Sequence, residues 1–346
     1  MLSKDELYHQ NIQPLKQNFG KHKLVLNTYV VVYTIFGYFL GLYLILLNQA
    51  EKNLLGMILI THTSIWSALL THEFIHETIF EKRSMNRLFG SLMTLISGAC
   101  YVSFKLLKQQ HIKHHCNKVG YDGFSITSWV LSLPASIRAV LITLEFFYIP
   151  VLSFISRWRT LLVPLLRPDY KYMRLRIVIV FLIRVTFFSI LYLINPWSIL
   201  YVFLAHIAML NILRVYDCYH HTFDIIPLGS PVPRLTNDYE QENTFSSLIN
   251  RKYYWTNWIF LNYGYHNAHH YKPNVPWHEL PNLDKAMYPS SEVHCILFPD
   301  LIIYYHRNRI NRIYKGLGSP TVKEGKLQIN KFWGIIMNIS FIVYDV

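Results

Sequence analysis

The sequence is poor in cysteine, with only four in 346 residues and no Cys-x-x-Cys pair. This excludes a disulfide framework and a cysteine-based zinc site, so we expect free thiols. Runs of lysine or arginine are also missing, as is any nucleic-acid-binding module, although the formal net charge is +13. Because the basic residues stand between apolar segments, anionic lipid headgroups are favoured as partners over nucleic acid.

Internal repeats, low-complexity tracts and interdomain linkers are absent as well, so we expect a single domain over residues 1–346. The N-terminal residues contain no small-residue cleavage site before the first apolar run, which is therefore expected to remain as an anchor. Hydrophobic residues make up 52% of the chain, above the roughly 45–50% of a soluble domain. The composition indicates a membrane-embedded protein.

Four apolar segments are long enough to cross a bilayer at 1.5 Å per helical residue. They are residues 24–48, 54–71, 177–194 and 197–213. Short links join them in pairs, and Pro196 supplies the turn of the second pair. The sequence therefore predicts an all-α membrane protein with about four transmembrane helices in two hairpins.

Basic residues between positions 157 and 176 are expected on the same, cytoplasmic side as the N-terminal lysines. Four spans satisfy this rule if the apolar segments 88–107 and 124–155 lie in the interface or re-enter without crossing. The more polar residues 214–330 are then expected to form a cytoplasmic cap. The last apolar run, 332–346, is too short to predict a span.

Histidines form three clusters. They are His72 and His76 in HEFIH; His111, His114 and His115 in HIKHH; and His266, His269 and His270 in HNAHH. Positions i, i+3 and i+4 share a helix face, so each cluster can direct its imidazoles towards one point. All three are predicted on the cytoplasmic face, where they can meet.

Chance does not explain these clusters. With 17 histidines in 346 residues, a random chain of this length contains about 0.04 copies of His-x-x-His-His, and this chain has two. Eight imidazoles exceed the four ligands of one tetrahedral zinc, but they suit two metals of higher coordination number, and imidazole is a good ligand for iron. We therefore expect a multi-histidine metal centre.

A further pair follows the second hairpin. Asp217 and His221 stand at i and i+4, so a continuing helix would direct both the same way, the carboxylate binding metal directly or through water. His220 would then point elsewhere. The sequence favours His221 over His220 as the ninth imidazole ligand and leaves the alternative open.

The boxes and their order resemble those of the integral-membrane fatty acid desaturase and hydroxylase family, over roughly residues 72–281. The resemblance implies a diiron centre on the cytosolic face that uses O2 against an unactivated C–H bond of a lipid, most commonly in fatty acid desaturation. It implies nine iron ligands, namely His72, His76, His111, His114, His115, His221, His266, His269 and His270. No cytochrome b5 haem motif is present, so electrons are expected from a separate ferredoxin, rubredoxin or cytochrome b5 type donor.

Four polar residues near the boxes could orient the imidazoles without binding metal. Glu73 and Glu77 flank the first box, and Asn262 and Asn267 lie near the third. An acceptor on one ring nitrogen fixes the tautomer of a ligating histidine. Solvated carboxylates at a helix end are the alternative interpretation of the two glutamates.

Other functions share some of these features. HEFIH also fits the His-Glu-x-x-His motif of zinc metalloproteases, but an intramembrane protease leaves both His-x-x-His-His clusters unexplained. A metal transporter would place its histidines near the bilayer midplane. Within the family, a lipid hydroxylase, a carotenoid oxygenase or an alkene-forming fatty acid decarboxylase would show similar boxes.

Overall fold

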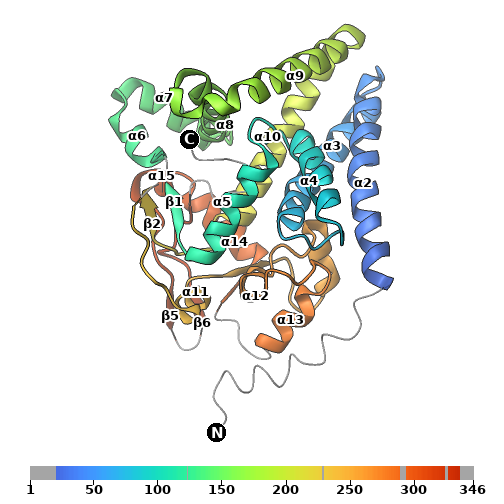
Figure 1. Cartoon of the computed structure of the whole chain (residues 1–346). Coiled ribbons are helices and arrows are strands. Elements are labelled where there is room, and N and C mark those ends of the chain that lie inside the picture. Colours follow the sequence, from blue (N-terminus) through green and yellow to red (C-terminus); the bar gives the residue numbers. More distant parts are fainter. Residues whose placement is uncertain (1–20, 123, 228–229, 289–293, 324–325, 336–346) are drawn as a thin grey trace.

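The computed structural model describes residues 21–122, 124–227, 230–288, 294–323 and 326–335, and it is mostly helical (Figure 1). The helices from residue 21 to residue 217 are α2 (Lys21–Leu46), α3 (Ala50–Ile75), α4 (Arg83–Ser97), α5 (Phe104–Asn117), α6 (Ile126–Ser132), α7 (Ala135–Phe146), α8 (Val151–Leu166), the 3-10 helix η2 (Pro168–Met173), α9 (Arg174–Ile194) and α10 (Trp197–Asp217). The helices after α10 are α11 (Asn237–Glu242), the 3-10 helix η3 (Tyr254–Phe260), α12 (His266–Tyr271), α13 (Leu280–Met287), α14 (Phe298–Asn308) and α15 (Asn311–Lys315).

Four helical segments of the described chain are long and apolar enough to cross a membrane. They are Lys23–Leu46, Ala50–Ile75, Pro168–Ile194 and Trp197–Asp217. The four predicted spans are therefore confirmed. The last three are longer than expected, whereas the first ends earlier, at Leu46. The extension matters for α3 and α10, because it carries each helix to the first histidine box and to Asp217 respectively.

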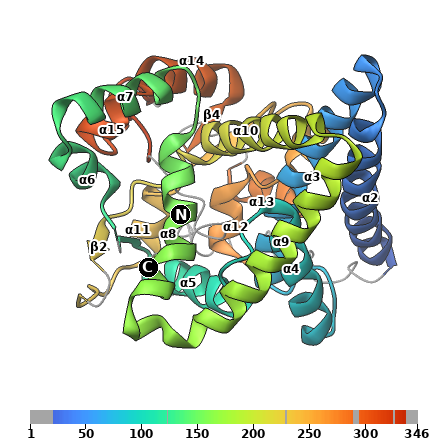
Figure 2. The same ribbon diagram turned by 90° about the horizontal axis from the view of Figure 1, so that it is seen from above.

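The first hairpin is held by a close approach of α2 and α3, which run side by side in Figure 1 and in the view from above in Figure 2. A side chain at Gly56 would place its Cβ 2.8 Å from the Gly41 carbonyl oxygen, and a Cβ at Gly41 would lie 3.1 Å from the Gly56 oxygen. Small residues let helices in lipid pack backbone to backbone. The two glycines thus allow the close spacing of α2 and α3.

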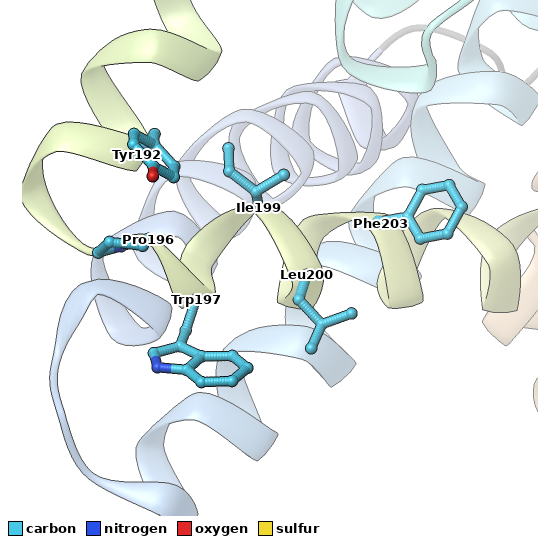
Figure 3. A pocket seen from close by; sticks show the side chains of 6 residues that line it. All are labelled: Tyr192, Pro196, Trp197, Ile199, Leu200 and Phe203. Carbon is cyan, nitrogen blue, oxygen red and sulfur yellow. The ribbon is translucent and has the colours of Figure 1, made fainter.

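The second hairpin turns at Asn195, whose Nδ2 donates to the carbonyl of Ile45 at the end of α2. This bond joins the turn of one hairpin to the other. An open apolar pocket lies at the same turn, and Figure 3 shows the six side chains that line it: Tyr192, Pro196, Trp197, Ile199, Leu200 and Phe203. The pocket is at the opposite end of α10 from Asp217, about 30 Å away at 1.5 Å per residue.

The two segments expected to lie in the interface or to re-enter contain broken helices. Residues 88–107 include the break between α4 and α5, where Gly98 ends α4 in the left-handed conformation. In residues 124–155 and beyond, α7 and α8 meet at a bend of 110°, and counting this bent pair as one span would give five. Neither segment supplies a straight span, and their position in the interface stays a prediction.

Short strands after α5 and α10 depart from the purely helical prediction. In the described residues they form three two-stranded sheets: β1 (Gly120–Asp122) with β2 (Ile225–Pro227), β3 (Ser246–Leu248) with β4 (Cys295–Leu297), and β5 (Thr321–Lys323) with β6 (Lys326–Gln328). The β1–β2 pair ties the chain that follows α5 to the chain that follows His221. The cytoplasmic position of residues 214–330 stays a prediction, and most of the apolar run 332–346 lies outside the described residues.

Candidate metal centre

The first histidine box lies at the end of α3, because that helix continues to Ile75 and His76 is its C-cap. Both imidazoles are buried. The Nδ1 atom of His72 is 3.1 Å from Oε1 of Glu73, whose other carboxylate oxygen accepts a hydrogen bond from the Thr78 hydroxyl at 2.7 Å. The Glu73 carboxylate therefore holds the His72 ring on one side and leaves Nε2 directed away from it.

The second box is carried by α5, which starts where the Ser103 hydroxyl accepts a hydrogen bond from the backbone N–H of Leu106. Spacing of three and four residues places His111, His114 and His115 along one side of this helix. The Nδ1 atom of His114 lies 3.0 Å from the carbonyl oxygen of Val119. The backbone beyond α5 thus orients this ring.

The third box forms the short helix α12, in which His266, His269 and His270 are all buried. The ninth histidine, His221, lies outside α10 and forms a β-bridge with Thr244. Its Nδ1 is 3.3 Å from the Thr244 hydroxyl oxygen. Elements far apart in the sequence therefore meet at one place, and Figure 1 shows α12 beside the lower end of α5.

Five imidazoles form the first group in which ligand atoms lie within 4.8 Å of one another. They come from His72, His76, His111, His115 and His269. The Nε2 atom of His111 lies 2.8 Å from Nε2 of His76 and 3.0 Å from Nε2 of His115. The Nε2 atoms of His269 and His115 are 3.2 Å apart. All three boxes contribute to this group.

The second group consists of His114, His221 and His270, and His266 extends it. The Nε2 atom of His221 is 3.2 Å from Nε2 of His114 and 2.8 Å from Nε2 of His266. The rings of His270 and His115 stack with centroids 4.2 Å apart, so this group adjoins the first. Together the two groups include all nine histidines that the sequence singled out.

The distances and orientations fit metal binding. Two nitrogens that are each about 2.1 Å from one metal and at right angles to each other lie about 3 Å apart, close to the observed separations. Nδ1 of His270 is 2.9 Å from the Glu240 carboxylate, whereas its buried Nε2 has no hydrogen-bond partner among the described residues. The donor set of nine imidazoles suits two metals of higher coordination number better than a single zinc.

Eight of the nine imidazoles are held neutral, which is the form that binds metal. Burial lowers the pKa of these eight, and neighbouring imidazoles lower it further: His76, His111, His114, His115, His221, His266, His269 and His270. A protonated ring would be both desolvated and repelled by its neighbours. The lone pairs needed for ligation are thus available near neutral pH.

Comparison with known families agrees with this geometry. The sequence profile of the family described as "Fatty acid desaturase" matches residues 53–299. The chain belongs to the fatty acid desaturase family. The matched region includes all nine histidines. It also covers the last two candidate membrane spans completely and the second span from residue 53 onwards. No curated protein and no solved structure matches the chain.

Within this desaturase fold, Asp217 and His220 form a buried polar contact next to the second group. The Oδ1 atom of Asp217 accepts a hydrogen bond from the Tyr263 hydroxyl at 2.7 Å and lies 3.1 Å from Nδ1 of His220. The ring of His220 stacks on His266 at 4.1 Å. His221, not His220, is therefore the one that approaches other imidazoles through Nε2.

The four residues predicted to orient imidazoles are placed differently from one another. Glu73 contacts His72 as described above, but Glu77 pairs instead with Lys108 and Arg83. The two asparagines bind other groups. Asn262 Nδ2 donates to the carbonyl of Trp277, and the side chain of Asn267 contacts Ser246, Gln241 and Tyr288.

Glu240 and Thr244 contact desaturase histidines but were not predicted from the sequence. Glu240 lies on α11, and burial raises its pKa to about 7, an effect that Lys118 opposes. Neither residue has a recognisable spacing to a box, since each reaches its histidine through the fold of the chain between α10 and α12. Only the buried position of a charged residue could have indicated Glu240, and burial is not visible in the sequence.

Proposed function

We propose that this chain is a membrane-bound diiron oxidoreductase that uses O2 to desaturate a fatty acyl chain. The observation that carries the proposal is the meeting of nine imidazoles in two adjoining groups, five in one and four in the other. Family membership and four apolar helices support a lipid as the substrate class. The whole chain is proposed to act as a single domain with its histidines on the cytoplasmic face.

The ligands of one iron would be His72, His76, His111, His115 and His269. Those of the other would be His114, His221, His266 and His270, with Asp217 acting through water. A bound iron pair supplies the oxidising power that cleavage of an unactivated C–H bond requires. The protein positions the ligands through Glu73, Glu240, Thr244 and the Val119 carbonyl, and it excludes water by burying the rings.

The electron balance of the reaction requires a partner. Removing two hydrogen atoms from the acyl chain supplies two electrons and two protons, whereas reduction of O2 to two waters takes four of each. Two more electrons and two more protons must therefore come from outside. We propose a separate ferredoxin, rubredoxin or cytochrome b5 type donor.

Expression in a host of defined lipid profile, followed by mass spectrometry of its lipids, tests the reaction. Loss of two hydrogens supports desaturation, gain of one oxygen indicates a hydroxylase, and loss of carbon indicates a decarboxylase. The variant His269→Ala should abolish the product while the protein stays in the membrane. His306→Ala is the matched control, because His306 is exposed and outside both groups. Unchanged lipid oxidation by His269→Ala would contradict the proposed site.

A further inference from the structure

Three arginines gather around the C-terminal end of α4, away from the nine histidines of the metal centre. Arg157 comes from α8, and Arg176 and Arg184 come from α9. Each donates to a backbone carbonyl of α4 or of the chain just after it, at Ser97, Cys100 and Leu95 respectively. A charge inside an apolar span is costly in lipid. The contact with Leu95 shows that the Arg184 guanidinium faces protein.

The arginines are packed closely with a histidine of α10. Nη1 of Arg157 lies 3.2 Å from Nε2 of His206. A side chain at Gly98 would place its Cβ 2.7 Å from that same Nη1 atom, and Gly98 also has a φ of +81°. Glycine is therefore required at this point for both reasons. The four elements α4, α8, α9 and α10 converge here.

The charge of this cluster is not balanced by the described part of the chain. None of the three arginines has a carboxylate within 4.0 Å among the described residues. The C-terminal end of a helix supplies only about half a negative charge, against three guanidinium groups that stay protonated. Burying charge without a counter-charge is unfavourable. An anion would correct this imbalance.

Several donor atoms at the cluster also lack partners. Nε and Nη2 of Arg157 and Nε of Arg176 are enclosed, and none of them has a hydrogen-bond partner among the described residues. The backbone carbonyls thus use only part of the donor capacity of the two side chains. Leaving a buried charged donor unsatisfied is costly. The unused donors are of the kind that bind oxyanions in pairs.

We propose that this cluster binds the oxyanion of an amphiphile, either the carboxylate of a fatty acid or the phosphodiester of an anionic lipid. An amphiphile is favoured over a free ion because α9 exposes apolar side chains next to the arginines, among them Leu182 and Ile183. The acyl chain would lie against this surface. The site is distinct from the metal centre, since His206 is about 16 Å along α10 from Asp217 at 1.5 Å per residue.

Native mass spectrometry of the full-length protein in detergent tests the proposal. The protein is incubated with oleate, with phosphatidylglycerol, or with zwitterionic phosphatidylcholine. Wild type should retain one anionic molecule per chain. The affinity of Arg157→Gln and of Arg184→Gln for this molecule should each be lower than that of wild type by about tenfold or more. Arg167→Gln is the matched control and should behave as wild type, because Arg167 is exposed and pairs with Asp169.

The result identifies the source of the oxyanion. Retention of oleate supports a carboxylate, and retention of phosphatidylglycerol supports a phosphodiester. The proposal is overturned if wild type retains neither, if it retains phosphatidylcholine equally well, or if both glutamine variants bind as wild type does. Equal iron content in all variants shows that they are folded. Should Arg157→Gln fail to accumulate, Arg176→Gln replaces it, since Nε of Arg176 is also enclosed and without a hydrogen-bond partner among the described residues.

Discussion

The Nδ1 atom of His270 lies 2.9 Å from the Oε1 atom of Glu240, and both side chains are buried. The carboxylate also lies 4.0 Å from the Lys118 ammonium, which ties α11 to the end of α5. One glutamate thus contacts a histidine of the third box and a residue that follows the second. The contact leaves Nε2 of His270 directed into the second histidine group.

Replacing Glu240 by glutamine should weaken metal binding. The variant Glu240→Gln keeps the shape of the side chain. The glutamine amide is a weaker acceptor than the carboxylate for the N–H at Nδ1 of His270, and it no longer fixes the orientation of the imidazole ring. Loss of such a partner typically costs 10–100-fold in metal affinity. We expect a decrease of about that size in iron affinity, measured by competition with a chelator.

Glu242→Gln is the matched control for this experiment, because Glu242 is exposed on the same helix. It should retain iron as wild type does. Equal chelator resistance of the two variants would show that Glu240 does not position His270.

His221 and His220 should differ in their effect on iron content. Nε2 of His221 lies among the imidazoles of the second group, whereas His220 contacts Asp217 and stacks on His266. We expect His221→Gln to reduce bound iron from about two to about one per chain, and His220→Gln to retain both. Metal analysis of the purified variants measures this. Loss of iron from His220→Gln alone would reverse the assignment.

The histidine boxes and the spans were predictable because each is a local pattern. A run of about 20 apolar residues specifies a span, and helical spacing directs the histidines of one box to one side. The pairing of boxes was not predictable, since His114 and His115 are adjacent in the chain but join different groups. That division depends on how α12 packs against α5.

The polar residues around the centre show the same limit. Glu77 is next to His76 in the chain, but its φ of +59° and the positions of Lys108 and Arg83 direct its carboxylate elsewhere. Glu240, 30 residues before His270, is brought to it by tertiary structure alone. Proximity in the sequence therefore identified Glu73 as a contact of its box but not Glu240.

Removing the Tyr263 hydroxyl should destabilise the protein. This hydroxyl donates to Oδ1 of the buried Asp217 at 2.7 Å. The variant Tyr263→Phe leaves that oxygen with fewer donors, and an unsatisfied buried acceptor costs about 1–3 kcal/mol. We expect a lower midpoint of thermal unfolding. Tyr253→Phe is the control, because Tyr253 is 51% exposed; an equal midpoint for both variants would refute the role of the Tyr263 hydroxyl.

Asp284 should make stability depend on pH in a predictable direction. Burial raises the pKa of this carboxyl to about 6, and Arg251, 3.8 Å away, opposes the increase. Because the folded-state pKa lies above the ordinary value of 3.8, the folded protein favours the protonated form. The stabilisation is complete below about pH 4 and is lost as the pH rises through about 6.

The variant Asp284→Asn resembles the protonated form at every pH, so it should be more stable than wild type by about 1–3 kcal/mol near pH 7.5. Arg251 would still donate to the Tyr288 carbonyl. The difference from wild type, measured as the midpoint of thermal unfolding, should shrink as the pH falls and approach zero only below about pH 4. Titration of groups common to both proteins cancels in this difference. Asp169→Asn should show no such trend, since the Asp169 side chain is 70% exposed. A difference between Asp284→Asn and wild type that is constant with pH would mean that Asp284 is ionised throughout in the folded protein.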